Sequence, residues 1–312
     1  MRIFDLHADI GADIYLKHNK NNKNVFKNDH LSKLLSGEVY GVTTACFFSG
    51  NEDWETMQAM VLATANELRE NSETTRWILS KEDFIIDDKI LAVISVEGMC
   101  GIIENPQDKI DWLYDNGVRV GSLTWNDSNR LAEGWPNDPL RGLSAMGEEV
   151  IKRMNQRKMI IDISHTNEKT FWDIISLSQS PIIATHSNAR SLCNHQRNLT
   201  DQQIKAIGLK GGLVGLNAAR GFINKDVEKQ NAHHLAIHGK YIADLIGYEH
   251  LAIGFDFMDF FPERYNGSMA NDLNSALESQ NLLVALKEIG FSDHEIKAIA
   301  YDNVYKFLKR YL

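Results

Sequence analysis

A histidine and an aspartate lie two positions apart near the start of the sequence, in His7-Ala8-Asp9. On an extended strand, side chains two residues apart point to the same face, so His7 and Asp9 can bind one ion while Ala8 faces away. Such a pair alone is more often a chance arrangement at a strand end. It gains weight because further residues of metal-ligand type follow other apolar runs, namely Glu97, His165, His186 and Asp256.

Two carboxylates and three imidazoles, from His7, Asp9, Glu97, His165 and His186, suit a borderline divalent metal such as zinc. A mononuclear catalytic zinc usually takes three protein ligands, so five donors predict two ions, about 3.5–4 Å apart, with one bridging carboxylate. Glu97 is the expected bridge, because its strand lies between those of the other two groups.

Asp256 is then left as a carboxylate beside the ions. We expect it to accept a proton from the bound water and to pass that proton to the leaving group. A role as a sixth metal ligand is the alternative.

The elements that must position these residues alternate along the whole chain. Apolar, β-branched runs predict eight strands, at residues 3–4, 42–48, 91–96, 118–123, 160–163, 181–185, 212–216 and 251–257. Their near-continuous hydrophobicity is typical of strands covered on both faces. Helical patterns lie between them, at residues 53–70, 107–114, 146–156, 168–177, 201–208, 231–246 and 272–289.

This alternation predicts an α/β fold, a (β/α)8 TIM barrel with an extra C-terminal helix that opens at the Ser292 and Glu295 capping box and runs to about Arg310. A doubly wound open sheet is the alternative. In a barrel, the C-terminal strand ends meet at one rim, which would bring the metal-ligand residues together.

Composition narrows the class of protein. The 312 residues carry a net charge of −9 without a basic stripe, which argues against nucleic-acid binding. No apolar run reaches the ~20 residues of a membrane span, and three scattered cysteines indicate no disulfide framework. No linker divides the chain, so we expect one hydrolase domain over residues 1–312. Because His7 comes so early, we expect no cleavable leader and a cytoplasmic location.

Five motifs in order carry a family resemblance. The segments Asp-Leu-His-Ala-Asp (5–9), Val-Glu-Gly (96–98), Asp-Ile-Ser-His (162–165), Thr-His-Ser-Asn (185–188) and Gly-Phe-Asp-Phe (254–257) resemble those of the membrane (renal) dipeptidase family, M19. These zinc peptidases are amidohydrolase-like barrels. The resemblance implies that His7 and Asp9 hold one zinc, that His165 and His186 hold the other, that Glu97 bridges them and that Asp256 shuttles the proton.

The resemblance also assigns substrate-binding residues. It implies that Arg197, in Gln196-Arg197-Asn198, binds the terminal carboxylate of the substrate, a contact that suits a guanidinium. At one position the chain departs from the family. Characterised dipeptidases have a histidine after Leu-Thr that polarises the scissile carbonyl, whereas this chain has Trp125 followed by Asn126. Indole offers no positive charge, so a zinc ion alone, or Asn126 with it, must take that role.

We therefore expect a binuclear zinc dipeptidase that cleaves small dipeptides, including those with a C-terminal D-residue, by metal-hydroxide attack. A metallohydrolase of another small amide, a lactone or a phosphoester is the alternative, and a non-catalytic metal-binding barrel is a third interpretation. The expected partner is a small-molecule dipeptide, with no nucleic acid and no membrane, and a homodimer is left open.

Overall fold

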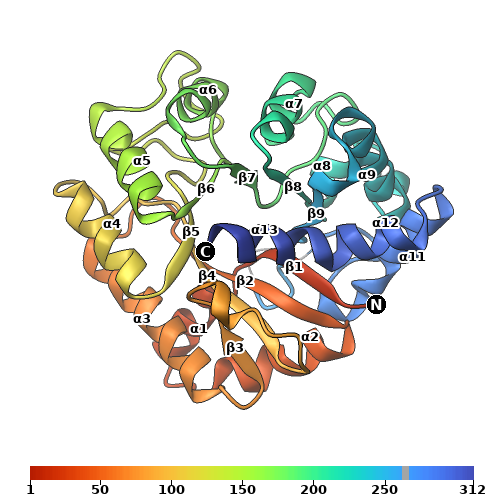
Figure 1. Cartoon of the computed structure of the whole chain (residues 1–312), viewed down its shortest axis with the longest axis horizontal. Coiled ribbons are helices and arrows are strands. Elements are labelled where there is room, and N and C mark those ends of the chain that lie inside the picture. The colour runs from red at the N-terminus through yellow and green to blue at the C-terminus, as the bar shows by residue number, and fades with distance from the viewer. Residues whose placement is uncertain (262–266) are drawn as a thin grey trace.

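The computed structural model describes residues 1–261 and 267–312 and contains a closed ring of parallel strands (Figure 1). The ring confirms the predicted (β/α)8 barrel. It closes because the first strand pairs on one side with the second and on the other with the last. Its eight strands are β1 (Ile3–Ala8), β2 (Val39–Phe47), β4 (Ile90–Glu97), β5 (Val118–Ser122), β6 (Ile160–Asp162), β7 (Ile182–Ala184), β8 (Leu213–Leu216) and β9 (Leu251–Ile253). A short strand outside the ring, β3 (Thr75–Trp77), pairs with the beginning of β4.

Helices surround the ring, and most agree with the sequence patterns. The helices that match the prediction to within one residue at each end are α3 (Trp54–Glu70), α4 (Pro106–Asp115), α5 (Ala145–Arg157), α6 (Glu168–Leu177), α7 (Asp201–Leu209) and α9 (Ala232–Ile246). Capping explains this accuracy. For example, Thr200 and Gln203 form a capping box at the start of α7, which satisfies backbone N–H groups at its first turn.

One predicted helix begins too early, and three helices were not predicted. The pattern at residues 272–289 begins too early, because a 3-10 turn (Ala276–Glu278) precedes α11 (Gln280–Glu288). The helices α1 (Ile10–His18) and α2 (Ser32–Ser36) were missed, and so was the short α8 (Arg220–Ile223). In α1, the buried residues include most of its first half and even Asp13, so no clear alternation of apolar and polar faces marks it.

The C-terminal helical segment closes one end of the barrel. It consists of α12 (Asp293–Lys297), a π-helical stretch (Ala298–Asp302) and α13 (Asn303–Tyr311), and it starts at the predicted Ser292 cap. Tyr301, Val304 and Leu308 pack with Phe4 and Leu91 from the beginnings of β1 and β4 in one apolar cluster. The segment therefore covers the N-terminal ends of the strands, where α13 crosses in front of them in Figure 1.

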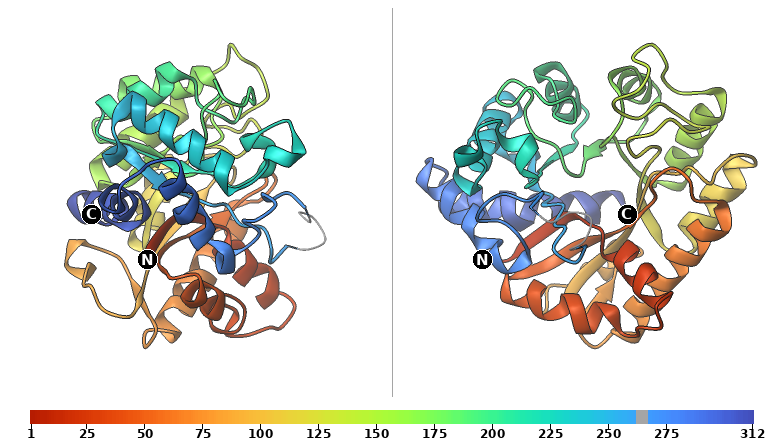
Figure 2. Two further views of the ribbon diagram at one scale, coloured as in Figure 1. Left: turned by 90° about the vertical axis from the view of Figure 1, so that its right-hand side faces the viewer. Right: turned by 180° about the vertical axis from the view of Figure 1, so that it is seen from behind.

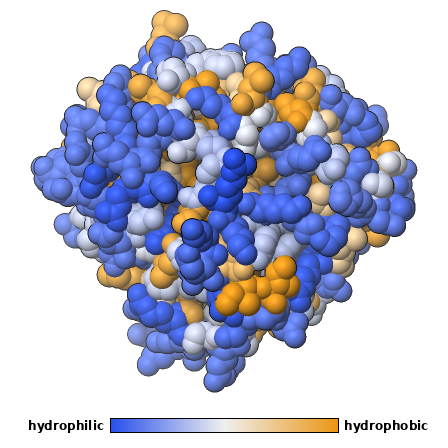
Figure 3. Space-filling model, viewed as in Figure 1, coloured by the Kyte–Doolittle hydropathy of each residue, from blue (hydrophilic) through white to orange (hydrophobic). Residues whose placement is uncertain are grey.

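The surface of this closed end is mostly hydrophilic, and apolar side chains form only small groups on it (Figure 3). The opposite face, seen from behind in Figure 2, carries the loops that follow the strands. Among the described residues, no helix has the length and apolar character that crossing a membrane requires.

Candidate metal centre and active site

The residues predicted as metal ligands meet at the C-terminal rim of the barrel, and all of them are buried. Glu97 is the last residue of β4, His7 lies in β1, and His165 and His186 follow β6 and β7. Asp9 differs from the expectation in one respect, because it lies just beyond the strand, at the N-cap of α1.

A register shift in β1 brings His7 to the interior of the barrel. Phe4 and Leu6 both belong to the interior apolar cluster, so simple alternation would turn His7 outward. The pairing of β1 with β2 shifts between Asp5 and Ala8, and such an irregularity re-aims a side chain. The buried Asp5 holds this stretch, since its Oδ1 accepts the backbone N–H of His7 at 3.1 Å and that of Phe255 at 3.0 Å.

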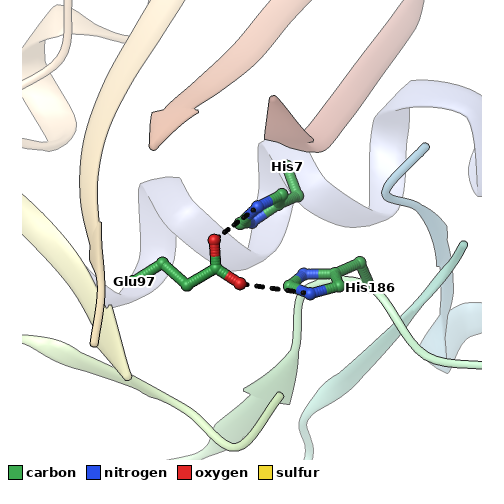
Figure 4. Close-up of side chains that lie close together, drawn as sticks. All are labelled: His7, Glu97 and His186. Atoms are coloured by element: carbon green, nitrogen blue, oxygen red, sulfur yellow. Dashed lines mark ion pairs between the residues drawn. The ribbon is translucent and has the colours of Figure 1, made fainter. Parts of the chain in front are cut away.

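The carboxylate of Glu97 faces His7 with one oxygen and faces His165 and His186 with the other. Its Oε2 lies 3.3 Å from His7 Nε2. Its Oε1 lies 2.7 Å from His165 Nε2 and 3.5 Å from His186 Nε2. Figure 4 shows His7 and His186 facing different oxygens of this carboxylate. Asp9 Oδ1 lies 3.3 Å from His7 Nε2. The donor atoms form two groups that share His7, one with Glu97 and His186 and the other with Asp9 and Asp256.

Hydrogen bonds on the far side of two rings determine which nitrogen can bind a cation. Thr185 donates its hydroxyl proton to Asp162 Oδ2 at 2.6 Å, so its oxygen accepts from His186 Nδ1 at 2.8 Å. Asn126 Oδ1 accepts from His165 Nδ1, also at 2.8 Å. With both Nδ1 atoms protonated, the Nε2 atoms carry lone pairs, and these face each other at 2.8 Å. A shared cation would satisfy both.

Two further buried atoms of this site, His7 Nε2 and Asp9 Oδ1, have no hydrogen-bond partner in residues 1–261 and 267–312. Buried polar atoms are normally paired, so unpaired ones at a cluster of nitrogen and oxygen donors need an explanation. The donor set fits divalent metal, in which neutral imidazole and carboxylate are the usual ligands.

The electrostatics of the site differ from one predicted ligand to another. Burial raises the pKa of Glu97, but His7 and His165 outweigh it and hold that pKa well below its usual value. Burial, together with Arg197, lowers the pKa of His165 to about 4, and burial with His7 lowers that of His186 well below its usual value. Glu97, His165 and His186 therefore favour the protonation states that bind metal, an ionised carboxylate and neutral imidazoles. His7 differs, because burial lowers its pKa but Glu97 and Asp9 outweigh burial and raise that pKa well above its usual value.

Asp256 lies beside His7 and Asp9. Its Oδ1 is 3.9 Å from His7 Nε2, and its Oδ2 accepts a hydrogen bond from Asn217 Nδ2 at 3.1 Å. Burial, with Asp9 and Glu97 adding to it, raises the pKa of this carboxyl group well above its usual value. Asp256 has a φ of 61°, in the left-handed region that non-glycine residues seldom adopt and that is common at functional sites.

A cavity of about 230 Å³ opens beside these groups. The residues predicted to bind substrate all line it, and they are Trp125, Asn126 and Arg197. Arg197 is buried and its Nη2 has no hydrogen-bond partner among the described residues, so a donor remains available for an anionic group. The ring of Trp125 packs against Phe47 with centroids 5.1 Å apart and forms part of the wall, whereas Asn126 also holds His165.

Several residues of this site were not predicted from the sequence. Trp135, His195 and Phe222 form an aromatic wall, with ring centroids 5.1 Å apart for the first pair and 4.5 Å for the second. Trp135 lies in an irregular loop where periodicity carries no signal. Asn217 could have been found, because it follows the apolar run of β8 directly, as a rim residue should.

A larger cavity of about 720 Å³ lies elsewhere, between α1, α2 and residues 259–261. Three lysines line it, and two of them are ion-paired, Lys17 with Asp13 and Asp29 and Lys33 with Asp259. The donor set, rather than cavity size, therefore marks the candidate active site.

Comparison with known proteins identifies the family of the chain. The family model for membrane dipeptidase, peptidase family M19, matches residues 1–311. The chain is 34% identical over 233 residues to an uncharacterised protein in the pqqA 5′ region of Klebsiella pneumoniae. The aligned region covers 72% of this chain and 83% of that protein. The chain is also 32% identical over 226 residues to the dipeptidase verJ of Clonostachys rogersoniana. This second aligned region covers 70% of the chain and 55% of verJ.

A solved structure has the same fold. It is a metallo peptidase from Rhodobacter sphaeroides bound to a phosphinate mimic of the dipeptide L-Ala-D-Ala, and it superposes with a TM-score of 0.86 at 23% identity, over 100% of this chain and 99% of the other. With a family match over nearly all of its length, the chain belongs to the membrane dipeptidase family, peptidase family M19, and is a metal-dependent hydrolase of peptide bonds.

Proposed function

We propose that this protein hydrolyses small dipeptides with two zinc ions, one held by His7 and Asp9, the other by His165 and His186, with Glu97 between them. The observation that carries the proposal is the position of the Glu97 carboxylate, whose two oxygens face separate imidazole groups. Divalent ions at such a site supply an acidified water and a positive charge for the carbonyl oxygen of the substrate.

Asp256 moves the proton in this proposal. The attacking water gives up a proton as its oxygen bonds to the scissile carbonyl carbon, and the Asp256 carboxylate accepts it. When the C–N bond breaks, the same group returns the proton to the departing nitrogen, so a neutral amine leaves. Its buried position beside the metal centre and the cavity supports this role.

Arg197 binds the free carboxylate of the dipeptide. Its buried guanidinium, in the wall of the cavity, has an Nη2 that no described residue pairs with, and an arginine there can hold a carboxylate in a bidentate manner. The small cavity also limits the length of the substrate, which favours dipeptides over longer peptides. The L-Ala-D-Ala mimic bound to the Rhodobacter sphaeroides protein makes a C-terminal D-residue a suitable first substrate to test.

Trp125 is the observation that favours a second candidate, hydrolysis of another small amide, a lactone or a phosphoester. It stands in the cavity wall where characterised dipeptidases have a histidine, and it offers no charge to a carbonyl oxygen.

The test compares kcat/KM for L-Ala-D-Ala, L-Ala-L-Ala, the C-terminal amide and a tripeptide, in the wild type and in Arg197→Ala. For the wild type, we expect the amide to be poorer than the acid by about 2–5 kcal/mol, the cost of leaving a buried charge unpaired. In Arg197→Ala this difference should largely disappear. Arg119→Ala, which removes a buried arginine that bonds to Leu79 O near the closed end, is the control and should keep the wild-type ratio.

Equal wild-type values for acid, amide and tripeptide would contradict the dipeptidase proposal. A panel of lactones and phosphoesters would then test the second candidate.

A further inference from the structure

The side chain of Asn217 links the end of β8 to Asp256. Asn217 is completely buried, and its Nδ2 donates to Asp256 Oδ2 at 3.1 Å. Its Oδ1 accepts the backbone N–H of Ala219 at 2.6 Å, which forms a local turn of the Asx type. The second contact fixes the orientation of the amide, since a flipped amide would place two donors against each other. The N–H group must therefore face Asp256.

The backbone of Asn217 is held independently of its side chain. Its N–H donates to Asn188 Oδ1 at 3.0 Å, and its carbonyl oxygen accepts from Asn188 Nδ2 at 2.9 Å. Asn188 is also completely buried and lies two residues after His186. The donor to Asp256 is thus fixed to the same rim that carries the metal-ligand residues, and a side-chain substitution at Asn217 leaves these backbone contacts in place.

The two oxygens of Asp256 have different surroundings. Oδ2 accepts from Asn217, while Oδ1 lies on the side of His7. A carboxylate with one oxygen committed to a hydrogen bond cannot rotate freely, and it keeps its other oxygen available for a proton.

We propose that Asn217 is a positioning residue for Asp256, which holds Oδ2 so that Oδ1 is the atom that accepts the proton and returns it to the amine. This inference rests on the proposed function, because it assigns Asn217 a role only if Asp256 transfers the proton. Among the described residues, Asn217 forms no hydrogen bond with a predicted metal ligand. In this proposal it does not contact the reacting atoms either.

The test uses Asn217→Ser in the metal-loaded enzyme with a dipeptide substrate. A serine hydroxyl can accept from the N–H two residues ahead, so it keeps the turn at Ala219, but it is too short to reach Asp256. We expect kcat to fall by about 10–100-fold, the usual scale for a residue that orients a group at a metal site, with KM and metal content close to wild type. Asn217→Ala is the second variant and should give the same result.

A double-mutant cycle with Asp256→Asn separates positioning from a general structural effect. If Asn217 acts through Asp256, Asn217→Ser should cause no further loss of kcat in the Asp256→Asn background. Asn303→Ala is the matched control. It removes a buried amide that donates to Tyr248 O and Leu251 O near the closed end, so it should lower stability and leave kcat unchanged.

An unchanged kcat in both Asn217 variants, or an equal loss with and without Asp256, would overturn the inference while the dipeptidase proposal stands. A wild-type enzyme that holds its metals and cleaves no dipeptide would instead overturn the proposed function, and the inference with it.

Discussion

The two ends of this barrel are built from the same strands and differ in nearly every physical respect. At the closed end, Leu91, Val304 and Leu308 pack in an apolar cluster with β1. At the open end, buried carboxylates and imidazoles face one another, and some of their atoms have no hydrogen-bond partner in the part of the chain that the structure describes. Burial of apolar side chains therefore stabilises the closed end. Burial of polar and charged side chains is costly at the open end, where a bound ion would offset that cost.

The largest expected effect on the difference between the two ends comes from removing the negative charge at the centre of the open end. Glu97→Gln keeps the shape of the side chain but removes the negative charge between the imidazole groups. We expect metal content to fall and dipeptide turnover to drop to background, the largest loss of any single change considered. Elemental analysis and kcat measure the two effects.

Glu67→Gln is the matched control for that variant. Glu67 is equally buried, but it accepts from the backbone of Val25 and Phe26 and contacts His18, away from the rim. It should lower stability and leave metal content unchanged. Full metal occupancy in Glu97→Gln would contradict the bridging role.

The second prediction separates proton transfer from metal binding within the open end. Asp256→Asn should keep its metals and lose about 10²-fold or more in kcat, the scale expected for a positioned acid–base group. Asp259→Asn, in the same loop and ion-paired with Lys33, should retain turnover. Loss of metal in Asp256→Asn would show that Asp256 is a ligand.

The third prediction concerns the closed end. Leu308→Ala should lower the free energy of unfolding by about 2–5 kcal/mol, because it leaves a cavity in a packed cluster. Metal content and kcat of the folded protein should not change. Leu209→Ala is the control, since that leucine is 90% exposed and its loss should alter stability little. A Leu308→Ala variant of wild-type stability, measured by urea unfolding, would show that α13 does not contribute to the core.

The smallest expected effect comes from Trp125→His. An imidazole that reaches the substrate carbonyl adds a donor, so dipeptide turnover should rise by about two- to tenfold, the range of one net hydrogen bond. Steady-state kinetics on L-Ala-D-Ala measure the change. A large loss would show instead that Trp125 shapes the cavity for a different substrate.

The sequence allowed the barrel and its rim to be predicted for physical reasons. Continuous apolar runs such as residues 91–96 identify strands covered on both faces, and the residue after each run, such as Glu97, must then lie at the rim. The register shift that turns His7 inward was not visible, because alternation along β1 gives the opposite side. The position of Trp135 was also beyond prediction, since it depends on the path of an irregular loop.

The closure of the barrel has a consequence for how the chain reaches its native state. Phe4 in the first strand packs against Tyr301 in the C-terminal segment, with ring centroids 5.9 Å apart, and β1 also pairs with β9. A nascent chain emerging from the ribosome therefore exposes the apolar interior until nearly all of its residues are synthesised. Contacts between such distant positions also slow folding, because the loop must close before they form. Chaperone binding to the unfinished chain would protect this interior until the last helix is available.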